Sequence, residues 1–422
     1  MSDLFYIENN ETVIIGNKVS GVWIKMGRNK YQEIINNGQL DNFITKYLEN
    51  HHLKKKQVIN SFYLLVTDRC NMNCKFCSIN ASAGKINGNE FSYEMLQNQI
   101  ETIKMINPKK VVISGGEPFV REDIFDIIRL LSQTVGREKL MIETNGLLIT
   151  ETMIDKIAPY VSTLEISIEN IIESTKLQNK FQRILDKMYE KNISTNLSFV
   201  ISSLNMCMLE RALEFSAKNN SSFIIRFLAP IGRAEKMDKN AFLTIRQINS
   251  IIIRIITYIL DNNLEGEKIA NSILPFFSIK TACAAGTGRT ISMFPDGNLY
   301  MCSNLHNDKY KIGNVFEQDS EEIFLQWKNK LEDFNLQREI IADFDEICMN
   351  CDFRYFCTGI CAAKRIQCID KFDEYLMTEC LLRKELIKYY LFLISKDDDK
   401  KTKLQKLKVY LQDINNSSRG EE

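Results

Sequence analysis

The sequence predicts an α/β protein whose central part is a sheet of six parallel strands connected by helices. Between Ser61 and about Pro230, short β-branched runs alternate with longer helical patterns, as βαβ units require. The chain has 422 residues and 45% hydrophobic content, enough to bury a sizeable core in two or three domains. Its 54 basic residues balance its 54 acidic residues, so no overall charge marks a nucleic-acid-binding protein.

Each strand of this sheet is expected where a short apolar run stands between helical patterns. These runs are Phe62–Val66, Lys110–Ser114, Leu140–Glu143, Leu164–Ser167, Thr195–Ile201 and Phe223–Phe227. Before them, shorter strands are expected at Leu4–Glu8, Thr12–Ile15 and Gly21–Lys25, with helices near Tyr31–Asn36 and Leu40–Tyr47. The last residues, 397–422, are rich in charge around one amphipathic stretch, Leu404–Leu411.

No apolar run of about 18 residues and no charged-then-apolar leader is visible, so we expect no membrane span, no secretory signal and a cytoplasmic location. The chain has twelve cysteines, and disulfides are a poor explanation for them because the cytoplasm is reducing. The clustering of these cysteines in the sequence favours metal binding. Cys70, Cys74 and Cys77 follow the first strand of the sheet with spacings of three and two residues. Three close cysteines suit a [4Fe–4S] cluster with one iron left for a small molecule, because structural zinc would need a fourth protein ligand.

This triplet, followed one βα unit later by Ser114-Gly-Gly-Glu-Pro118, resembles the signature of the radical S-adenosylmethionine (SAM) enzymes. The resemblance implies a partial (β/α)6 barrel with its cofactor site at the carboxyl ends of the strands. It also implies that SAM binds the free iron through its amino and carboxylate groups. Reductive cleavage then gives a 5′-deoxyadenosyl radical, with electrons from an external flavodoxin- or ferredoxin-like donor.

The same resemblance assigns residues to the SAM site at the ends of the strands. They are Phe76, Gly115, Gly116, Glu117, Thr144, Asn145 and Ser167. For the glycines, which let a backbone approach a ligand, the alternative is a bare turn. Glu169 and Asn170 replace the Asp-Gly that the family commonly has, so the cation for the SAM carboxylate is not identified. Candidates are Lys176, Lys180 and Arg183, each otherwise a solvated helix residue. Arg226 begins a segment that ends in Pro-x-Gly-Arg and resembles the sixth strand of many peptide-modifying members, so we expect it to point into the barrel and to contact SAM or the substrate; the alternative is a strand followed by a turn.

Seven cysteines and a glycine in the last third of the chain resemble the SPASM domain, an auxiliary-cluster domain of radical SAM peptide and protein maturases. The residues are Cys283, Gly297, Cys302, Cys348, Cys351, Cys357, Cys361 and Cys380. The resemblance implies one cluster on Cys283, Cys302 and Cys361 and another on the other four cysteines, hence three [4Fe–4S] clusters in all. The first has either an open iron or Cys368 as its fourth ligand; Cys368 is otherwise a buried thiol. A zinc ribbon built from Cys348, Cys351, Cys357 and Cys361 is the alternative for this region.

Three strands followed by helices at the amino terminus resemble the RiPP recognition element, a small winged-helix-like domain that binds the leader of a ribosomal precursor peptide by strand addition. A structural cap or dimer arm is the alternative. The expected organisation is a recognition domain in residues 1–60, the barrel in 61–240, a helical linker in 241–279, the SPASM domain in 280–385, and a helix and tail in 386–422.

Together these resemblances imply an oxidoreductase that matures a precursor peptide by installing a thioether or carbon–carbon cross-link, with neither nucleic acid nor membrane as partner. The runner-up is an anaerobic sulfatase-maturating type of enzyme that oxidises Cys or Ser to formylglycine. A non-catalytic iron–sulfur electron carrier is the third alternative, which the Gly-Gly-Glu-Pro segment disfavours.

Overall fold

A nine-stranded sheet forms the centre of the computed structural model, in the order β12-β11-β10-β4-β5-β6-β7-β8-β9. The structure describes residues 3–18, 21–50, 59–83, 90–272, 283, 285, 288–344, 346–357 and 359–417. The six expected strands are all present, and neighbouring pairs are parallel. They are β4 (Ser61–Leu65), β5 (Lys110–Ser114), β6 (Leu140–Thr144), β7 (Thr163–Ser167), β8 (Ser194–Ile201) and β9 (Ser222–Phe227). The predicted α/β fold class is therefore confirmed.

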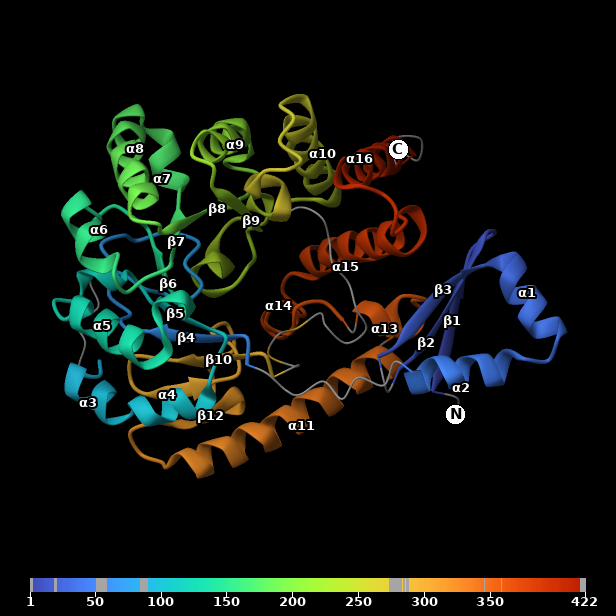
Figure 1. Cartoon of the computed structure of the whole chain (residues 1–422), viewed down its shortest axis with the longest axis horizontal. Coiled ribbons are helices and arrows are strands. Elements are labelled where there is room, and N and C mark those ends of the chain that lie inside the picture. The colour runs from blue at the N-terminus through green and yellow to red at the C-terminus, as the bar shows by residue number, and fades with distance from the viewer. Residues whose placement is uncertain are drawn as a thin grey trace.

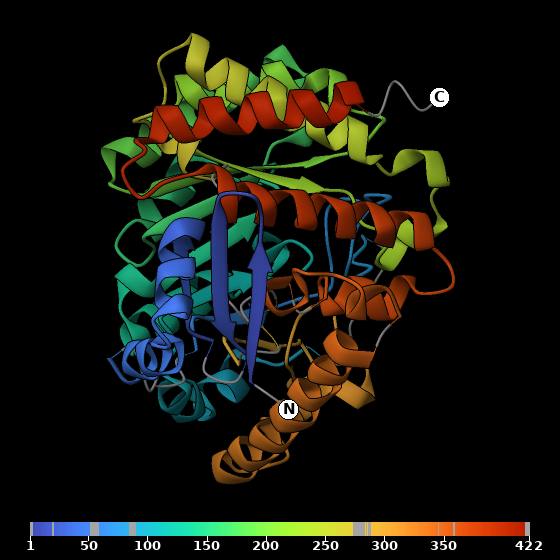
Figure 2. The same cartoon turned by 90° about the vertical axis from the view of Figure 1, so that its right-hand side faces the viewer.

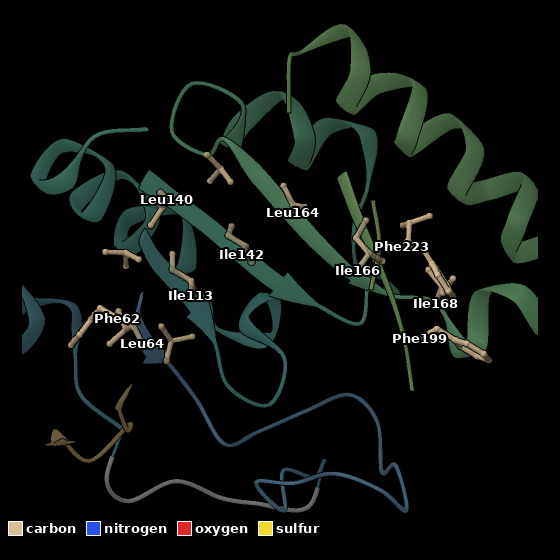
Figure 3. Packing of buried hydrophobic residues seen from close by; sticks show 14 of the residues in the cluster. Phe62, Leu64, Ile113, Leu140, Ile142, Leu164, Ile166, Ile168, Phe199 and Phe223 are labelled. Carbon is tan, nitrogen blue, oxygen red and sulfur yellow. The ribbon is translucent and has the colours of Figure 1, made fainter. Parts of the chain in front are cut away.

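Helices cover the outer face of this curved sheet (Figure 1). They are α3 (Tyr93–Asn98), α4 (Ile100–Ile106), α5 (Ile124–Val135), α6 (Glu151–Ile157), α7 (Glu169–Glu173), α8 (Thr175–Glu190), α9 (Leu209–Lys218) and α10 (Ile245–Asp261). Alternate strand residues, which point to one face of a sheet, pack beneath them. Figure 3 shows this core, in which Ile142 and Leu164 are fully buried. The intervening residues therefore face the interior of the partial barrel.

The sheet continues into the carboxyl-terminal half of the chain, which the sequence did not predict. The added strands are β10 (Thr290–Met293), β11 (Asn298–Tyr300) and β12 (Lys311–Asn314). β10 pairs in parallel with β4, and β11 and β12 follow as antiparallel neighbours. Gly297 makes the turn between β10 and β11 with φ of +82°, where a side chain would overlap the ring of Phe316. This pairing places Cys302, just after β11, near the first strand of the barrel.

The amino-terminal residues form a separate antiparallel sheet with two helices, as expected from the sequence. Its elements are β1 (Leu4–Glu8), β2 (Thr12–Asn17), β3 (Trp23–Gly27), α1 (Arg28–Asn36) and α2 (Leu40–Asn50). One face packs on the helices through Val13, Ile15 and Ile44. The other face, which includes Phe5 and Ile14, packs on α13 and α15 in the carboxyl-terminal part (Figure 2).

The carboxyl-terminal part is mainly helical. Its helices are α11 (Ser320–Phe344), α12 (Glu346–Met349), α13 (Arg354–Cys357), α14 (Ala362–Cys368), α15 (Asp373–Lys388) and α16 (Lys400–Ser417), with a π-helical turn at Tyr389–Leu393. α16 returns to the barrel, where Leu404, Leu407 and Leu411 are fully buried in the main core. The five expected domain limits stay predictions.

Short single turns connect several of these elements. They lie at Pro118–Val120, Arg137–Lys139, Met206–Met208, Gly232–Lys236, Lys239–Ala241, Lys268–Ser272 and Asp308–Tyr310. One segment, Lys239–Asp261, is long and apolar enough to cross a membrane on length and composition alone, although the sequence suggested no such run. In this fold its α10 residues Ile251 and Ile255 are buried in the main core.

Candidate active site

Three cysteines converge on the loop that follows β4. Cys70, Cys74 and Cys77 are each half-buried, and the Cys77 N–H donates to the Cys74 carbonyl over 3.3 Å. Burial raises the pKa of the Cys74 thiol to about 11, and the thiolates of Cys70 and Cys77 also raise it. The three sulfur atoms therefore lie within electrostatic reach of one another. Three converging thiols in a half-buried loop fit a cluster with three protein ligands, whose binding would release their protons.

The Gly-Gly-Glu-Pro segment after β5 packs directly against the base of this cysteine loop. Gly116 donates to the Thr67 carbonyl over 2.7 Å, and Glu117 donates to the Arg69 carbonyl over 2.9 Å. A side chain at Gly115 or Gly116 would overlap these same carbonyl oxygens. The two glycines are therefore required for backbone packing, independently of SAM. The SAM contacts assigned to Gly115, Gly116 and Glu117 stay predictions.

A buried carboxylate links three of the segments that the sequence singled out. Glu117, with 0% exposure, accepts hydrogen bonds from the Thr144 hydroxyl (2.8 Å) and from the N–H groups of Asn145 (2.8 Å) and Phe119 (3.2 Å). Burial raises the pKa of Glu117 to about 7, opposed by these hydrogen bonds. The Asn145 amide nitrogen lies 3.8 Å from the Cys70 sulfur. Glu117, Thr144 and Asn145 are therefore brought together beside the cysteine loop.

The other predicted SAM residues lie around the same edge of the sheet. Phe76 lies between the second and third cysteines and packs against the cluster that contains Leu228 and Cys368. Ser167 ends β7, in register with Ser198 on β8. Glu169, which replaces the family's Asp, accepts a hydrogen bond from the Val200 N–H over 2.5 Å. Their contacts with SAM stay predictions.

Sequence reasoning missed the residue that holds the cysteine loop from the opposite side of the barrel. Arg233, after β9, donates from Nε to the Cys74 carbonyl (2.8 Å) and from Nη1 to the Ala81 carbonyl (2.6 Å). Its own N–H donates to the Cys77 carbonyl over 3.1 Å. Gly232 has φ of +62°, and a side chain there would lie 2.6 Å from that carbonyl oxygen. The Gly-Arg of the Pro-x-Gly-Arg segment was the signal for this role.

The candidate cations for the SAM carboxylate are arranged differently from one another. Lys176 and Arg183 are exposed on α8. Lys180 is half-buried and donates to the Leu147 carbonyl over 3.3 Å, two residues after Asn145. Arg226 forms an ion pair with Glu165 at 2.5 Å. The roles of these four residues stay predictions.

The carboxyl-terminal cysteines form two separate groups. Burial raises the pKa of Cys302 to about 12, and the thiolates of Cys361 and Cys283 raise it as well. Burial also raises the pKa of Cys357, with Cys380 and Cys351 among its neighbours. Cys361 therefore neighbours Cys302, whereas a zinc ribbon would join it to Cys357. Within the described part of the chain, no three His, Cys, Asp or Glu side chains are placed to hold one metal ion. The two ligand sets stay predictions.

Two further thiols stand apart from these groups. Cys368 is fully buried, with its sulfur 3.5 Å from the Pro230 carbonyl, and Cys361 is among the groups that raise its pKa. Its role as a fourth ligand stays a prediction. Cys207 is exposed in the short turn before α9.

Comparisons with known proteins agree with this arrangement. The sequence profile of the Radical SAM superfamily matches residues 64–216, and that of the SPASM iron–sulfur cluster-binding domain matches residues 283–352. The GTP 3′,8-cyclase of Geobacter sulfurreducens is 34% identical over 133 residues, which are 30% of this chain and 41% of that protein. The AdoMet-dependent heme synthase of Methanosarcina barkeri is 23% identical over 340 residues, 72% of this chain and 94% of that protein. The chain thus spans less than half the length of the first of these relatives.

Solved structures share the fold over most of the chain. Streptococcus suis SuiB bound to S-adenosylmethionine has 15% identity and a TM-score of 0.58, covering 89% of this chain and 97% of SuiB. SuiB bound to the precursor peptide SuiA has 14% identity and a TM-score of 0.58, with 86% and 95% coverage. The enzyme anSMEcpe with bound AdoMet has 18% identity and a TM-score of 0.55, with 78% and 98% coverage. At these identities the likeness is one of fold.

Proposed function

We propose that this chain, a radical SAM enzyme with a carboxyl-terminal SPASM domain, installs a thioether or carbon–carbon cross-link in a ribosomally made precursor peptide. The observation that carries this proposal is the amino-terminal domain. The likeness to SuiB covers 89% of the chain, more than residues 61–422 alone make up, so it extends into that domain. SuiB is also known in complex with a precursor peptide. We place the enzyme in the cytoplasm with an external electron donor.

The described residues would do four things in such a reaction. Cys70, Cys74 and Cys77 would hold the catalytic cluster, and Arg233 would fix their loop. Glu117 would position the segments that line SAM. When bound, the cluster and SAM supply the radical that takes a hydrogen atom from the peptide. The two carboxyl-terminal groups of cysteines would hold two auxiliary clusters, which gives three clusters in all. For each cross-link the peptide would lose two hydrogen atoms, one to that radical and the other as a proton and an electron, with an oxidised iron–sulfur cluster as the electron acceptor.

A second function, oxidation of a Cys or Ser in a sulfatase, is favoured by the fold likeness to anSMEcpe. That likeness covers 78% of the chain, less than residues 61–422 alone make up. A likeness of that extent does not require the amino-terminal domain. Whether modification of the substrate depends on the amino-terminal domain therefore distinguishes the two functions.

Strand addition needs a sheet edge with outward-pointing backbone groups. Among the described residues, β1 and β3 are the two edges of the amino-terminal sheet. Asn17 donates to the Val22 carbonyl and Arg28 donates to the Glu11 carbonyl. Because hydrogen-bonded residues alternate in an antiparallel pair, the even-numbered residues of β3 bond β2, and the backbone of Lys25 points to the open edge.

Point substitutions at this edge test leader binding better than deletion of the domain, because its removal would expose Phe356 and Ile387. We expect Lys25→Pro, which removes an outward N–H, to weaken binding of a fluorescent leader at least tenfold by anisotropy. Lys25→Ala is the matched control, since it keeps the N–H and removes the same side chain, which donates to the Ile394 carbonyl and lies near Asp398 and Lys406. Equal affinities for the two variants would rule out this edge as the leader site.

A further inference from the structure

The barrel interior carries a group of polar side chains directly below the candidate SAM site. We call Tyr63, Ser114, Glu143, Glu165 and Arg226 the lumen cluster. Each alternates along its strand with residues that pack under the helices; in Figure 3, for example, Ile142 and Leu164 belong to that outer core. The cluster therefore draws on five of the six parallel strands.

Carboxylates outnumber guanidinium groups in the lumen cluster. Glu143 and Glu165 are in register on the adjacent strands β6 and β7. Arg226 pairs with Glu165 at 2.5 Å, whereas Glu143 accepts a hydrogen bond from the uncharged Ser114 hydroxyl at 2.8 Å. The nearest other cation on these strands is Lys110, which is exposed at the opposite end of β5 with its Nζ 3.5 Å from the Met141 sulfur. Glu143 thus has a neutral partner beside a second carboxylate.

Electrostatics show the same imbalance. Burial raises the pKa of the Glu143 carboxyl and the neighbouring Glu165 carboxylate raises it further, whereas the hydrogen bond from Ser114 and the more distant charges of Arg226 and Lys110 lower it. Burial, together with Glu143 and Glu165, raises the pKa of Tyr63 to about 12. A cation placed beside Glu143 would relieve this repulsion and replace the water that the carboxylate loses on burial.

Two further observations point to a ligand in this position. Ser292 on β10 is fully buried and in register with Tyr63, and its hydroxyl has no hydrogen-bond partner among the described residues. This leaves an unsatisfied polar atom on the face that carries the cluster. The Arg226 side chain keeps 45% of its surface exposed, so the cluster reaches solvent through this residue.

We infer that the lumen cluster binds a cationic side chain of the substrate, an ammonium or guanidinium group, with Glu143 as its counter-ion. Glu143 immediately precedes Thr144, whose hydroxyl bonds Glu117, so the cation would lie beneath the segments predicted to line SAM. This inference rests on the proposed function, because it assumes a peptide substrate. It selects precursor peptides with a lysine or arginine beside the residue that is modified.

The test uses small probes on the cluster-loaded protein with SAM present. By titration calorimetry, N-acetyl-lysine amide or N-acetyl-arginine amide should bind at least tenfold more tightly than uncharged N-acetyl-norleucine amide, and the tighter of the two identifies the cation. Equal affinity for all three would overturn the inference. Because no probe carries a leader, this failure would leave the proposed function untouched. Binding of a cationic probe without modification of any precursor peptide would contradict the proposed function but not the cation site.

A variant then assigns the counter-ion. Glu143→Gln keeps the shape and should lose about tenfold of the preference for the cationic probe, as for a partly buried charge pair. Glu151→Gln, in the exposed first turn of α6, is the matched control and should keep the full preference. SAM affinity should be the same in both variants. A loss of SAM affinity in Glu143→Gln with unchanged probe binding would show instead that the cluster belongs to the SAM site. If Glu143→Gln fails to fold, the comparison of the three probes on the unmodified protein still tests whether the site binds a cation.

Discussion

The cysteine loop should depend on the guanidinium of Arg233 for its shape. That side chain donates to the carbonyl oxygens of Cys74 and Ala81 at 2.8 and 2.6 Å. In Arg233→Met both carbonyls lose a charged donor, while the backbone bond to Cys77 can remain. At about 1.5 kcal/mol for each bond, the lower end for charged donors, the ordered loop loses about 3 kcal/mol, or about a hundredfold in its equilibrium against disordered forms.

The assay is retention of iron by the anaerobically reconstituted protein during titration with a chelator. Arg233→Met should release about four irons, those of one cluster, at far lower chelator concentration than the unmodified protein. Arg233→Lys, which keeps the charge but not the forked donors, should fall between them. Arg137→Met is the matched control, because Arg137 also donates to two backbone carbonyls, of Ala158 and Asn192, away from the cysteine loop. Identical release curves for Arg233→Met and Arg137→Met would refute the reasoning.

Three further predictions concern Glu117, Gly232 and Phe356. Burial raises the pKa of Glu117 from its ordinary 4.5 to about 7, so the stability that protonated Glu117 contributes to the fold is full below pH 4.5 and is lost as the pH rises through about 7. Glu117→Gln should remove about 3 kcal/mol of this pH dependence, seen as a thermal midpoint that varies less with pH. The same dependence of the midpoint on pH in Glu117→Gln would contradict the assignment. Gly232→Ala should lose both iron and stability. The control Gly38→Ala, at a similar φ of +64° but with open space around it, should lower the free energy of unfolding by about 1 kcal/mol and keep its iron. Equal iron loss in the two variants would disprove the role of Gly232. Phe356→Ala should loosen the amino-terminal sheet by about 3 kcal/mol, measured by faster amide exchange in β1, and unchanged exchange would argue against that interface.

Local patterns were sufficient to predict the parallel sheet. The strand predicted at Lys110–Ser114 has the buried apolar run Val111–Ile113 at its centre, as buried parallel strands do, and the observed β5 has the same limits. The amino-terminal strands were also predicted, with β1 again matching and β3 displaced by two residues. The candidate site followed from motifs at the carboxyl ends of strands, and the structure does bring Glu117, Thr144 and Asn145 together beside Cys70.

The rest depends on contacts between residues that are far apart in the sequence. Pairing of β10 with β4 joins segments more than 200 residues apart. A strand of only four residues, Thr290–Met293, does not indicate from its sequence which strand it pairs with. The role of Arg233 depends on contacts with residues 152 and 159 positions earlier, so the local sequence around it indicates only a turn. The packing of Phe5 on Phe356 is likewise invisible to any local pattern.

The most direct test of the account is mass spectrometry of a short peptide encoded beside the gene, co-expressed with the enzyme under anaerobic conditions. We predict a peptide that is lighter by two hydrogen atoms for each cross-link, with fragmentation blocked between the joined residues. The variant with Cys70, Cys74 and Cys77 all replaced by Ala should leave the peptide unmodified and should lack about four irons while keeping the rest. An unmodified peptide with the intact enzyme, or the same cross-link with the triple variant, would contradict the account.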